Sequence, residues 1–194
     1  MAKKSTRNTR GRIVSAAWKL FYEQGYEDTT VEEIIELSGT SKGSFYHYFD
    51  GKDALLSTLS SLFDEKYEEL TGLLTPEMTA MEQLLFLNRE LFHMIEDSIS
   101  LDLLARLYST QLTTSGEKHL LDHNRIYYKL LRKIIAKGQA EGQLSSRSNV
   151  NEMVKLYALC ERALLYDWCL CAGEYALTEY SAKVLPGFLS SFLP

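Results

Sequence analysis

The sequence has few of the features that mark secreted, membrane or disulfide-stabilised proteins. It holds three cysteines among 194 residues, an odd number grouped near the C-terminus as Cys160, Cys169 and Cys171. This excludes a disulfide framework and fits a reducing compartment. No run of eighteen or more uncharged apolar residues occurs, and the N-terminus lacks the apolar stretch of a signal peptide. We therefore expect a soluble, cytoplasmic protein that does not enter a membrane.

Patterns that carry enzymatic chemistry are also missing. The chain has no G-x-S-x-G turn, no phosphate-binding P-loop and no dinucleotide glycine fingerprint. His119 and His123 lie four residues apart beside Asp122, a spacing that can place two imidazoles on one metal, but no third ligand is fixed nearby. Two exposed histidines are the better interpretation, and packing is the better one for the cysteines, although an exposed cysteine of lowered pKa would suit a redox sensor. We predict no enzyme, no cofactor and no metal site.

Charge is distributed unevenly along the chain. The net charge of −5 by itself argues against a nucleic-acid-binding protein. Residues 1–12, however, carry five basic groups and no acid, so the other 182 residues hold 21 − 5 = 16 basic and 26 acidic groups, net −10. A basic arm before an acidic body suits a protein whose N-terminal part contacts phosphates. The five basic residues are Lys3, Lys4, Arg7, Arg10 and Arg12.

The stretch 30–55 predicts two short helices separated by a tight turn. Thr30 and Glu33 form a T-x-x-E capping box, which starts a helix that Gly39 can end in a left-handed conformation. Ser41 or Thr40 can then cap a second short helix, from about residue 42 to 48. Two helices joined by a short turn that contains glycine are typical of the helix-turn-helix, whose second helix enters the major groove of DNA.

Residues of the second helix carry the groups that DNA recognition requires. Phe45 and Phe49, four apart, are the expected core anchors and leave the neighbouring side chains exposed. We expect bases to be contacted by the first turn of this helix, and phosphates by hydroxyl, imidazole and ammonium groups around it. The alternative is an ordinary three-helix core with half-buried tyrosines. The predicted DNA-binding residues are Thr30, Thr40, Ser41, Lys42, Gly43, Ser44, Tyr46, His47, Tyr48 and Lys52.

The same stretch resembles a known family. The run T-x3-I-x4-G-x-S-x-G-x-F-Y-x-Y-F-x2-K-x2-L between Thr30 and Leu55 is similar to the DNA-binding domain of the TetR/AcrR transcriptional regulators. The preceding helix fits as well, since its apolar residues 13–21 recur at helical spacing and stop at Gly25-Tyr26. Ile35, Ser38 and Thr40 depart from the commonest pattern, which has smaller or apolar residues there. The resemblance implies a dimeric bacterial regulator with an effector pocket in its body.

The rest of the chain predicts an all-α fold of about nine helices. After the N-terminal domain, 1–52, periodic apolar residues predict helices at 52–75, from 76 to about 95, and at 101–112, 117–141, 149–171 and 177–192. Thr75 is the expected cap of the second of these, with Pro76 at its first position. Residues 53–194 then form a helical ligand-binding and dimerisation domain, and the long helix at 52–75 is the expected lever between the two domains.

The last two helices have apolar residues on more than one side, so they need cover on two sides. A second copy of the chain related by two-fold symmetry can supply that cover as a four-helix bundle. A buried helix pair in a monomer is the alternative. The predicted dimer residues are Leu156, Cys160, Ala163, Leu164, Val184, Leu185, Phe188 and Leu189.

Aromatic residues of the central helices can line an apolar cavity with hydroxyl groups at its wall, as in a small-molecule site. Those proposed are Phe92, Tyr108, Tyr127 and Tyr157, and the alternative is that they simply fill the core. The sequence thus predicts a dimeric repressor that binds a pseudo-palindromic operator in double-stranded DNA and is released by a small-molecule effector. A helical interaction or adaptor protein without DNA binding is the alternative.

Overall fold

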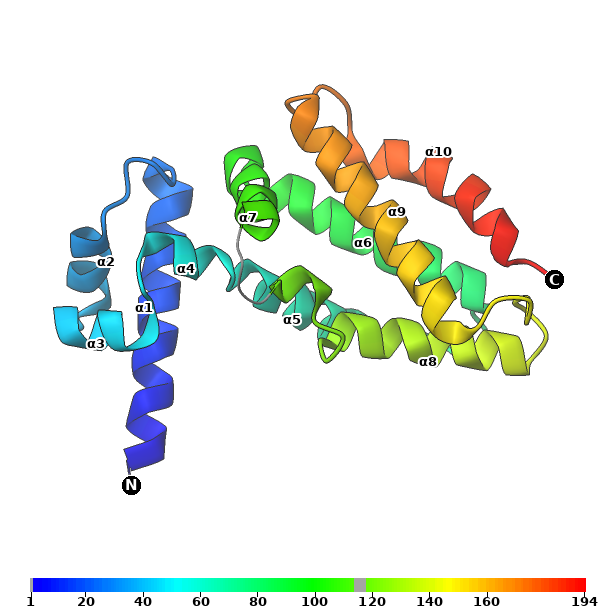
Figure 1. Ribbon diagram of the computed structural model, residues 1–194, viewed down its shortest axis with the longest axis horizontal. Helices are drawn as coiled ribbons and strands as arrows, with labels where there is room; N and C mark the ends of the chain where they lie inside the picture. Colours follow the sequence, from blue (N-terminus) through cyan, green and yellow to red (C-terminus); the bar gives the residue numbers. More distant parts are fainter. Residues whose placement is uncertain (1, 114–117) are drawn as a thin grey trace. The chain divides into compact units, whose positions relative to one another are not determined.

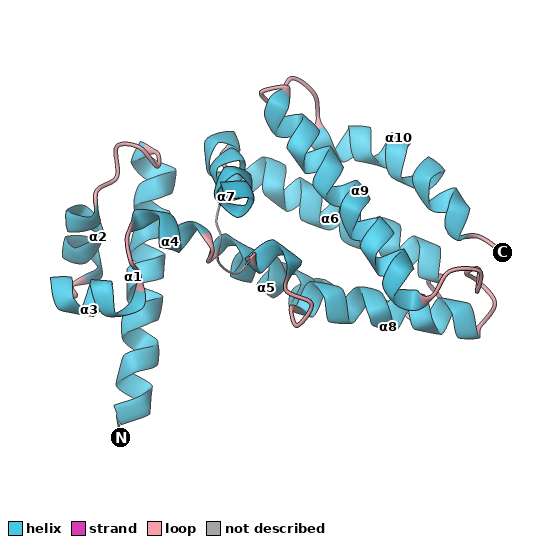
Figure 2. Cartoon of the chain, viewed as in Figure 1, coloured by secondary structure: helices cyan, strands magenta, loops and turns pink. Residues whose placement is uncertain are grey.

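A computed structural model describes residues 2–113 and 118–194, with side chains from residue 9 onward. The basic side chains of Lys3, Lys4 and Arg7 and the expected helix start at Glu117 therefore lie outside the described residues. Within the described ranges there is no strand, and ten α-helices and two 3-10 turns make up the structure (Figures 1 and 2). The all-α prediction is confirmed.

The helices follow one another with short connections. Their bounds are α1 Ala2–Gln24, α2 Val31–Ser38, α3 Lys42–Tyr48, α4 Lys52–Leu56, α5 Leu59–Thr71, α6 Ala80–Ser98, α7 Leu101–Thr113, α8 Ile126–Ala140, α9 Val150–Leu170 and α10 Leu177–Leu189. The 3-10 turns η1 and η2 span His119–Leu121 and Ser190–Phe192.

The chain divides into two compact units. The first comprises Met1–Ser61 with Asp102–His119, and the second Leu62–Leu101 with Leu120–Pro194. From Asp102 onward, helix α7 thus belongs to the same unit as the N-terminal helices, although residues 62–101 and 120–194 belong to the other. The functional boundary after residue 52 stays a prediction.

The core of the first unit is formed where α2 and α3 pack against one side of α1 (Figure 1). Apolar side chains of α1 are buried here because they recur every three or four residues, and Ile34 of α2 and Phe45 of α3 fill the space opposite them. The buried residues contributed by α1 are Ile13, Ala16, Ala17 and Phe21.

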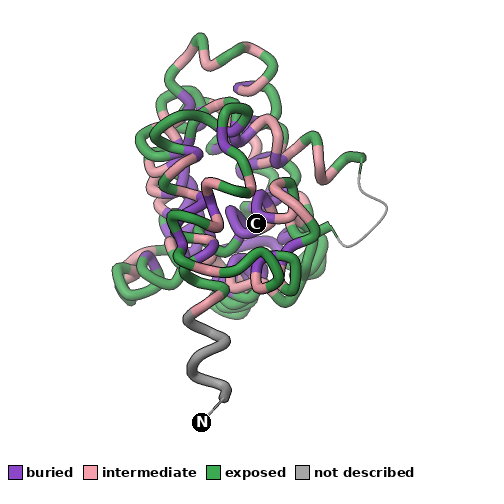
Figure 3. The backbone as a smooth tube through the Cα atoms, turned by 90° about the vertical axis from the view of Figure 1, so that its left-hand side faces the viewer, coloured by how far each residue is buried: buried purple, intermediate pink, exposed green. Residues whose placement is uncertain are grey.

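In the second unit, α10 packs against α6 and α9, and α8 packs against the same two helices. Buried and exposed residues alternate along the turns of the helices, as Figure 3 shows, because each helix packs against its neighbours with part of its surface. Gly138 permits a close approach: a Cβ atom there would lie 2.5 Å from the Ala80 Cβ and 2.9 Å from Leu144 side-chain atoms. Only glycine fits between these neighbours without a shift of the chain.

The predicted helix at 52–75 is divided in the structure, which corrects that prediction. A turn at Ser57 and Thr58 separates α4 from α5, and α5 ends at Thr71. The Thr58 hydroxyl donates to the Leu55 carbonyl at 2.6 Å and accepts from the Trp18 indole at 2.9 Å. A tertiary contact to α1 thus stabilises the break, and apolar periodicity alone did not reveal it.

Two further helix starts differ from the prediction. Helix α6 begins at Ala80, because Thr79 and Glu82 form a complete capping box, whereas Thr75 starts a turn. Helix α8 begins at Ile126, because the Asp122 carboxylate accepts the Asn124 N–H at 2.8 Å in a local turn. Helix α10 contains Pro186 and continues through it to Leu189.

Candidate nucleic-acid interface

The helix-turn-helix begins with a reciprocal cap. The Thr30 hydroxyl accepts the Glu33 N–H at 3.2 Å, and the Glu33 carboxylate accepts the Thr30 N–H at 2.7 Å. Hydrogen bonds donated to the Glu33 carboxylate lower its pKa, and the largest effect comes from the Thr30 backbone N–H. Gly39 ends α2 with φ of 60°. The sequence therefore determines both ends of this helix, as expected.

Helix α3 presents one face outward and one inward. Phe45 and Phe49 are buried, whereas Lys42, Gly43 and His47 are exposed and Tyr46 is 45% exposed. Ser44 and Tyr48 are half-buried. Of the predicted base-contacting residues, Lys42, Gly43 and Tyr46 thus lie on the exposed face that the spacing of the two phenylalanines indicated, and Ser44 lies at its edge.

Lys42 has only loose contacts within the chain. Its ammonium lies 3.6 Å from the Glu32 carboxylate and 6.0 Å from the centre of the Tyr46 ring, and both partners of the ion pair are about 70% exposed. Exposed pairs of this kind contribute little stability. Lys42 can therefore exchange Glu32 for a phosphate or a base at small cost.

The turn between α2 and α3 is held by short-range hydroxyl contacts. The Ser38 and Thr40 hydroxyl groups are 2.8 Å apart, and Ser41 caps α3 by accepting the Ser44 N–H at 3.1 Å. Ser38 and Thr40 are two of the positions at which the sequence departs from the commonest family pattern. Their mutual hydrogen bond satisfies polar groups that would otherwise lie against a partly buried turn.

Arg12 also holds this turn, although the sequence suggested only a role in a basic arm. One guanidinium nitrogen donates to the carbonyl oxygens of Ser38 and Gly39, the second at 2.6 Å. These are carbonyl groups at the C-terminal end of α2, where a positive charge is favourable. A long-range contact between residues 26 positions apart carried no signal in the sequence.

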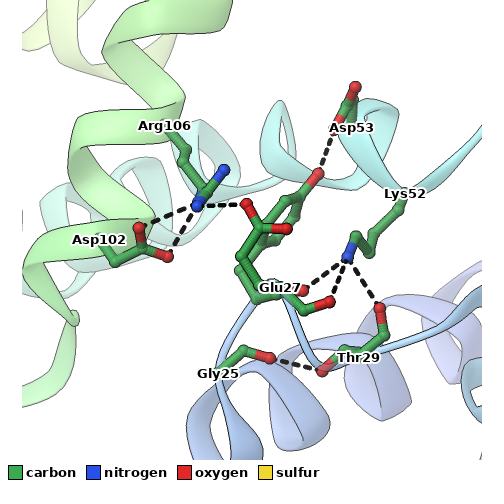
Figure 4. A network of polar contacts seen from close by, with 8 residues as sticks. Gly25, Glu27, Thr29, Lys52, Asp53, Asp102 and Arg106 are labelled. Carbon is green, nitrogen blue, oxygen red and sulfur yellow. Dashed lines mark hydrogen bonds and ion pairs between the residues drawn. The ribbon is translucent and has the colours of Figure 1, made fainter.

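Lys52 is likewise engaged within the chain. Its ammonium donates to the carbonyl oxygens of Tyr26 at 2.6 Å, Glu27 at 3.2 Å and Thr29 at 2.8 Å (Figure 4). An ammonium has three N–H donors, and three acceptors are present here. The structure therefore gives Lys52 a role in holding the loop between α1 and α2, and a phosphate contact by this residue stays a prediction.

Comparison with known proteins supports the assignment of this region. Residues 13–59 match the profile of the N-terminal domain of the bacterial regulatory proteins of the TetR family. Residues 13–59 therefore form an N-terminal domain of the TetR family. The regulator TtgR of Pseudomonas putida is 34% identical over 68 residues, which cover 35% of this chain and 32% of TtgR. The matches to the first curated relatives span about a third of the length of those proteins.

Other relatives match the chain along most of its length. The fatty acid metabolism regulator protein of Bacillus subtilis is 23% identical over 90% of both chains. The solved structure of FadR from Thermus thermophilus, a TetR-family repressor in complex with lauroyl-CoA, is 26% identical over 95% of both chains, with a TM-score of 0.75. These similarities show that the shared helical fold extends through the body of the chain.

Three of the four predicted pocket residues lie in the second unit of the chain. Phe92, Tyr127 and Tyr157 are buried there, while Tyr108 belongs to the first unit. The Tyr127 hydroxyl donates to the carboxyl group of Glu161 at 2.6 Å. A pocket formed by these aromatic residues stays a prediction.

Glu161 is the centre of a buried polar cluster that the sequence did not identify. Its other oxygen accepts the Asn88 side-chain amide at 2.9 Å, and Asn88 accepts the Ser181 hydroxyl at 2.5 Å. Burial raises the pKa of the Glu161 carboxyl, and the hydrogen bonds from Tyr127 and Asn88 oppose that rise. The cluster joins α6, α8, α9 and α10.

Burial also divides the eight predicted dimer residues. Cys160, Leu164, Leu185 and Leu189 pack inside the chain itself, so they offer no surface to a partner. Leu156, Val184 and Phe188 are half-buried and Ala163 is exposed. Helix periodicity identified apolar residues but did not show which side of each helix its own unit covers. On α9 and α10, the large apolar residues that are exposed but were not among the predicted dimer residues are Leu159, Tyr166, Leu170 and Tyr180.

No group of three or more His, Cys, Asp or Glu residues that could hold a metal occurs among the described residues. His123 packs against the ring of Tyr128, with centroids 4.7 Å apart. None of the described helices combines the length and apolar character needed to cross a membrane.

Proposed function

We propose that this chain is a sequence-specific DNA-binding transcriptional regulator that acts as a dimer, and that it is a repressor released from its operator by a small molecule. The observation that carries the proposal is the capped pair α2 and α3 within the matched TetR-family segment, with polar and aromatic side chains of α3 on its exposed face. Such a pair places its second helix in the major groove. The protein then acts in the bacterial cytoplasm.

In this proposal the first turn of α3 contacts base edges through Lys42, Gly43 and Ser44, and the Lys42 ammonium also neutralises a neighbouring phosphate. Tyr46 contacts a base and the backbone. His47 and Tyr48 hold phosphates. Thr30, Thr40 and Ser41 supply hydroxyl groups at the helix ends, where they already cap α2, hold the turn and cap α3 respectively. Their contribution to DNA binding is therefore mainly to hold both helices in place.

A dimer forms through the outer faces of α9 and α10. Leu159 is 52% and Leu170 66% exposed, and Tyr166 and Tyr180 are also exposed large apolar residues. With Leu156, Ala163, Val184 and Phe188 they supply apolar residues on the outer faces of two neighbouring helices. A second copy would cover them and place the two helix-turn-helix domains about 34 Å apart along DNA.

For the effector we propose a fatty acyl-CoA. The support is the similarity along nearly the whole chain to the Bacillus subtilis fatty acid metabolism regulator and to Thermus thermophilus FadR, which was solved with lauroyl-CoA. The body of this chain is built from amphipathic helices around an apolar and aromatic core, which suits an apolar ligand.

The first test is selection of bound fragments from the DNA of the source organism by purified protein. We expect a pseudo-palindrome whose half-sites lie about one helical turn or slightly more apart. If folded, dimeric protein enriches no sequence, the proposal is wrong, and a helical adaptor without DNA binding becomes the better interpretation.

The effector is tested on that operator with lauroyl-CoA, using free coenzyme A and laurate as controls. Lauroyl-CoA should weaken operator binding, because a ligand shifts the equilibrium only through its preference for one conformation. Equal operator affinity with and without lauroyl-CoA would reject the acyl-CoA class while leaving the DNA-binding proposal intact.

A further inference from the structure

Helix α7 contacts the loop between α1 and α2 through Arg106. The Arg106 guanidinium lies 2.5 Å from the Glu27 carboxylate and 5.0 Å from the centre of the Tyr26 ring. Asp102, one turn earlier on α7, accepts a second contact from the Arg106 Nε at 2.9 Å (Figure 4). The side chain is therefore oriented from its own helix before it reaches Glu27.

Two cations lie close to the Tyr26 ring. The Lys52 ammonium is 4.3 Å from the ring centre, and the Arg106 guanidinium also lies within cation–π range. The ring is buried, and the Tyr26 hydroxyl donates to the Asp53 carboxylate of α4. Burial and this hydrogen bond raise the pKa of Tyr26, so the hydroxyl stays a donor. We call Tyr26, Glu27, Lys52, Asp53 and Arg106 the Tyr26 cluster.

The loop in this cluster supports the start of α2. Thr29 is buried, its hydroxyl donates to the Gly25 carbonyl at 2.7 Å, and its own carbonyl accepts from Lys52. The next residue is Thr30, the N-cap of α2. A displacement of the loop would therefore move the first turn of α2, which packs on α1 and α3.

Helix α7 directly follows a segment of the second unit in the chain. Leu101 belongs to the second unit and Asp102 to the first, so α7 is covalently joined to the body but packs within the unit that holds the helix-turn-helix. Among the described residues, Arg106–Glu27 is the ion pair that joins segment 102–113 to the N-terminal segment.

We propose that Arg106 is a positioning residue for operator recognition. Through the Tyr26 cluster it fixes the helix-turn-helix to α7, and this restricts the positions that each DNA-binding domain of the dimer can take. The inference rests on the proposed DNA-binding function. A dimer whose two DNA-binding domains are restricted in position binds best to half-sites at one separation. Arg106 does not contact DNA, and its role appears only when two half-sites must be bound together.

The test compares Arg106→Ala with wild type on the selected operator, on an operator with two extra central base pairs, and on a single half-site. We expect Arg106→Ala to bind the half-site like wild type but to lose about three- to ten-fold of the preference for the native spacing, as suits a partly exposed ion pair with a ring contact. Unchanged spacing preference in a folded Arg106→Ala protein would overturn the proposal.

Arg89→Ala is the matched control. Arg89 also contacts a carboxylate, Glu90 at 2.8 Å, and an aromatic ring, Phe86 at 5.5 Å, but all three residues lie on α6. This control should keep the native spacing preference. Glu27→Gln should reproduce the effect of Arg106→Ala, and the double variant should add less than the two single effects combined.

A second measurement needs no operator and so distinguishes failure of this inference from failure of the proposed function. Amide hydrogen exchange should quicken at residues 26–30 and in α7 of Arg106→Ala, with α9 and α10 unchanged, because the cluster restrains the loop. Identical exchange in wild type and Arg106→Ala at residues 26–30 would overturn the inference, whatever DNA the protein binds.

Discussion

Lys42 and Arg12 are both basic residues of the helix-turn-helix region, yet their contacts differ. Lys42 is opposed only by an exposed carboxylate at 3.6 Å, whereas Arg12 donates to two carbonyl oxygens at the end of α2. The first is free to neutralise a phosphate, and the second holds the turn. Salt dependence distinguishes the two roles, because only a phosphate contact releases counterions from DNA.

Lys42→Ala should weaken operator binding by about ten-fold or more and lower the slope of log affinity against log salt by about 0.9, the value for one lost phosphate contact. Titrations at several salt concentrations measure this. Lys19→Ala, an exposed lysine of α1, is the control. An unchanged slope for Lys42→Ala would show that Lys42 does not contact a phosphate.

Arg12→Ala should weaken operator binding by about five-fold, because it removes charge-assisted hydrogen bonds at the turn. The salt slope should remain that of wild type. The same titrations provide the measurement. A slope lowered by about 0.9 would instead assign Arg12 to the phosphate-binding arm.

Glu161→Gln tests the buried cluster through pH. Because burial raises the folded-state pKa of Glu161 above 4.5, the stabilising effect of its protonated form is complete below pH 4.5 and is lost as the pH rises through the folded-state pKa. Glutamine keeps the shape without titrating. Urea unfolding between pH 4.5 and 8 should therefore show Glu161→Gln gaining stability relative to wild type as the pH rises. A constant difference would mean that Glu161 titrates alike in both states.

At the scale of elements, helix ends are fixed both by neighbours in sequence and by distant side chains. Local caps start α2, α3, α6 and α9, each with a Ser, Thr or Asn whose side chain accepts a backbone N–H. Helix α10 has no such cap of its own. Its first N–H groups donate to Glu96 of α6, at 2.5 Å from Leu177 and 3.0 Å from Thr178.

Glu96→Ala should lower the free energy of unfolding by about 1–2 kcal/mol, since it leaves N–H groups of α10 without their acceptor. Urea unfolding followed by circular dichroism measures the loss. Glu68→Ala, an exposed residue of α5, should change stability by less than about 0.5 kcal/mol. Equal stabilities of the two variants would show that water replaces Glu96 as the acceptor.

At the scale of the whole molecule, the proposed dimer depends on two sides of α9 and α10. One side of each helix is buried within its own chain, and the other side carries exposed apolar residues that a second copy can cover. Leu159, at 52% exposed, contributes apolar surface to α9 without belonging to its core face. Substitution there should affect association and leave folding intact.

Leu159→Glu should therefore yield a folded monomer, because it places a charge in the centre of an apolar interface. Sedimentation measures the mass. Operator binding should weaken by more than about a hundred-fold, because a monomer has one DNA-binding domain where the dimer has two that are linked. Glu152→Gln at the exposed start of α9 is the control. A dimeric Leu159→Glu protein would place the interface elsewhere.

Short-range patterns in the sequence determined the helix-turn-helix. The Thr30–Glu33 box, Gly39 and the Phe45–Phe49 spacing gave the bounds of α2 and the exposed face of α3, because each depends on residues no more than four positions apart. Long-range contacts gave no such signal. Thr58 breaks the predicted long helix while its hydroxyl accepts from Trp18, and Lys52 and Arg106 meet around Tyr26.

The same distinction separates the two sides of α9 and α10. Their sequences show that many residues are apolar. The pattern of a single helix does not show which of these residues pack within the chain and which pack against a partner. Only the packing of α6 and α8 against them shows that Leu185 is buried in its own chain and that Leu159 is not. Local hydrogen bonding is encoded by neighbouring residues, whereas the covered side of a helix is decided by elements far away in the chain.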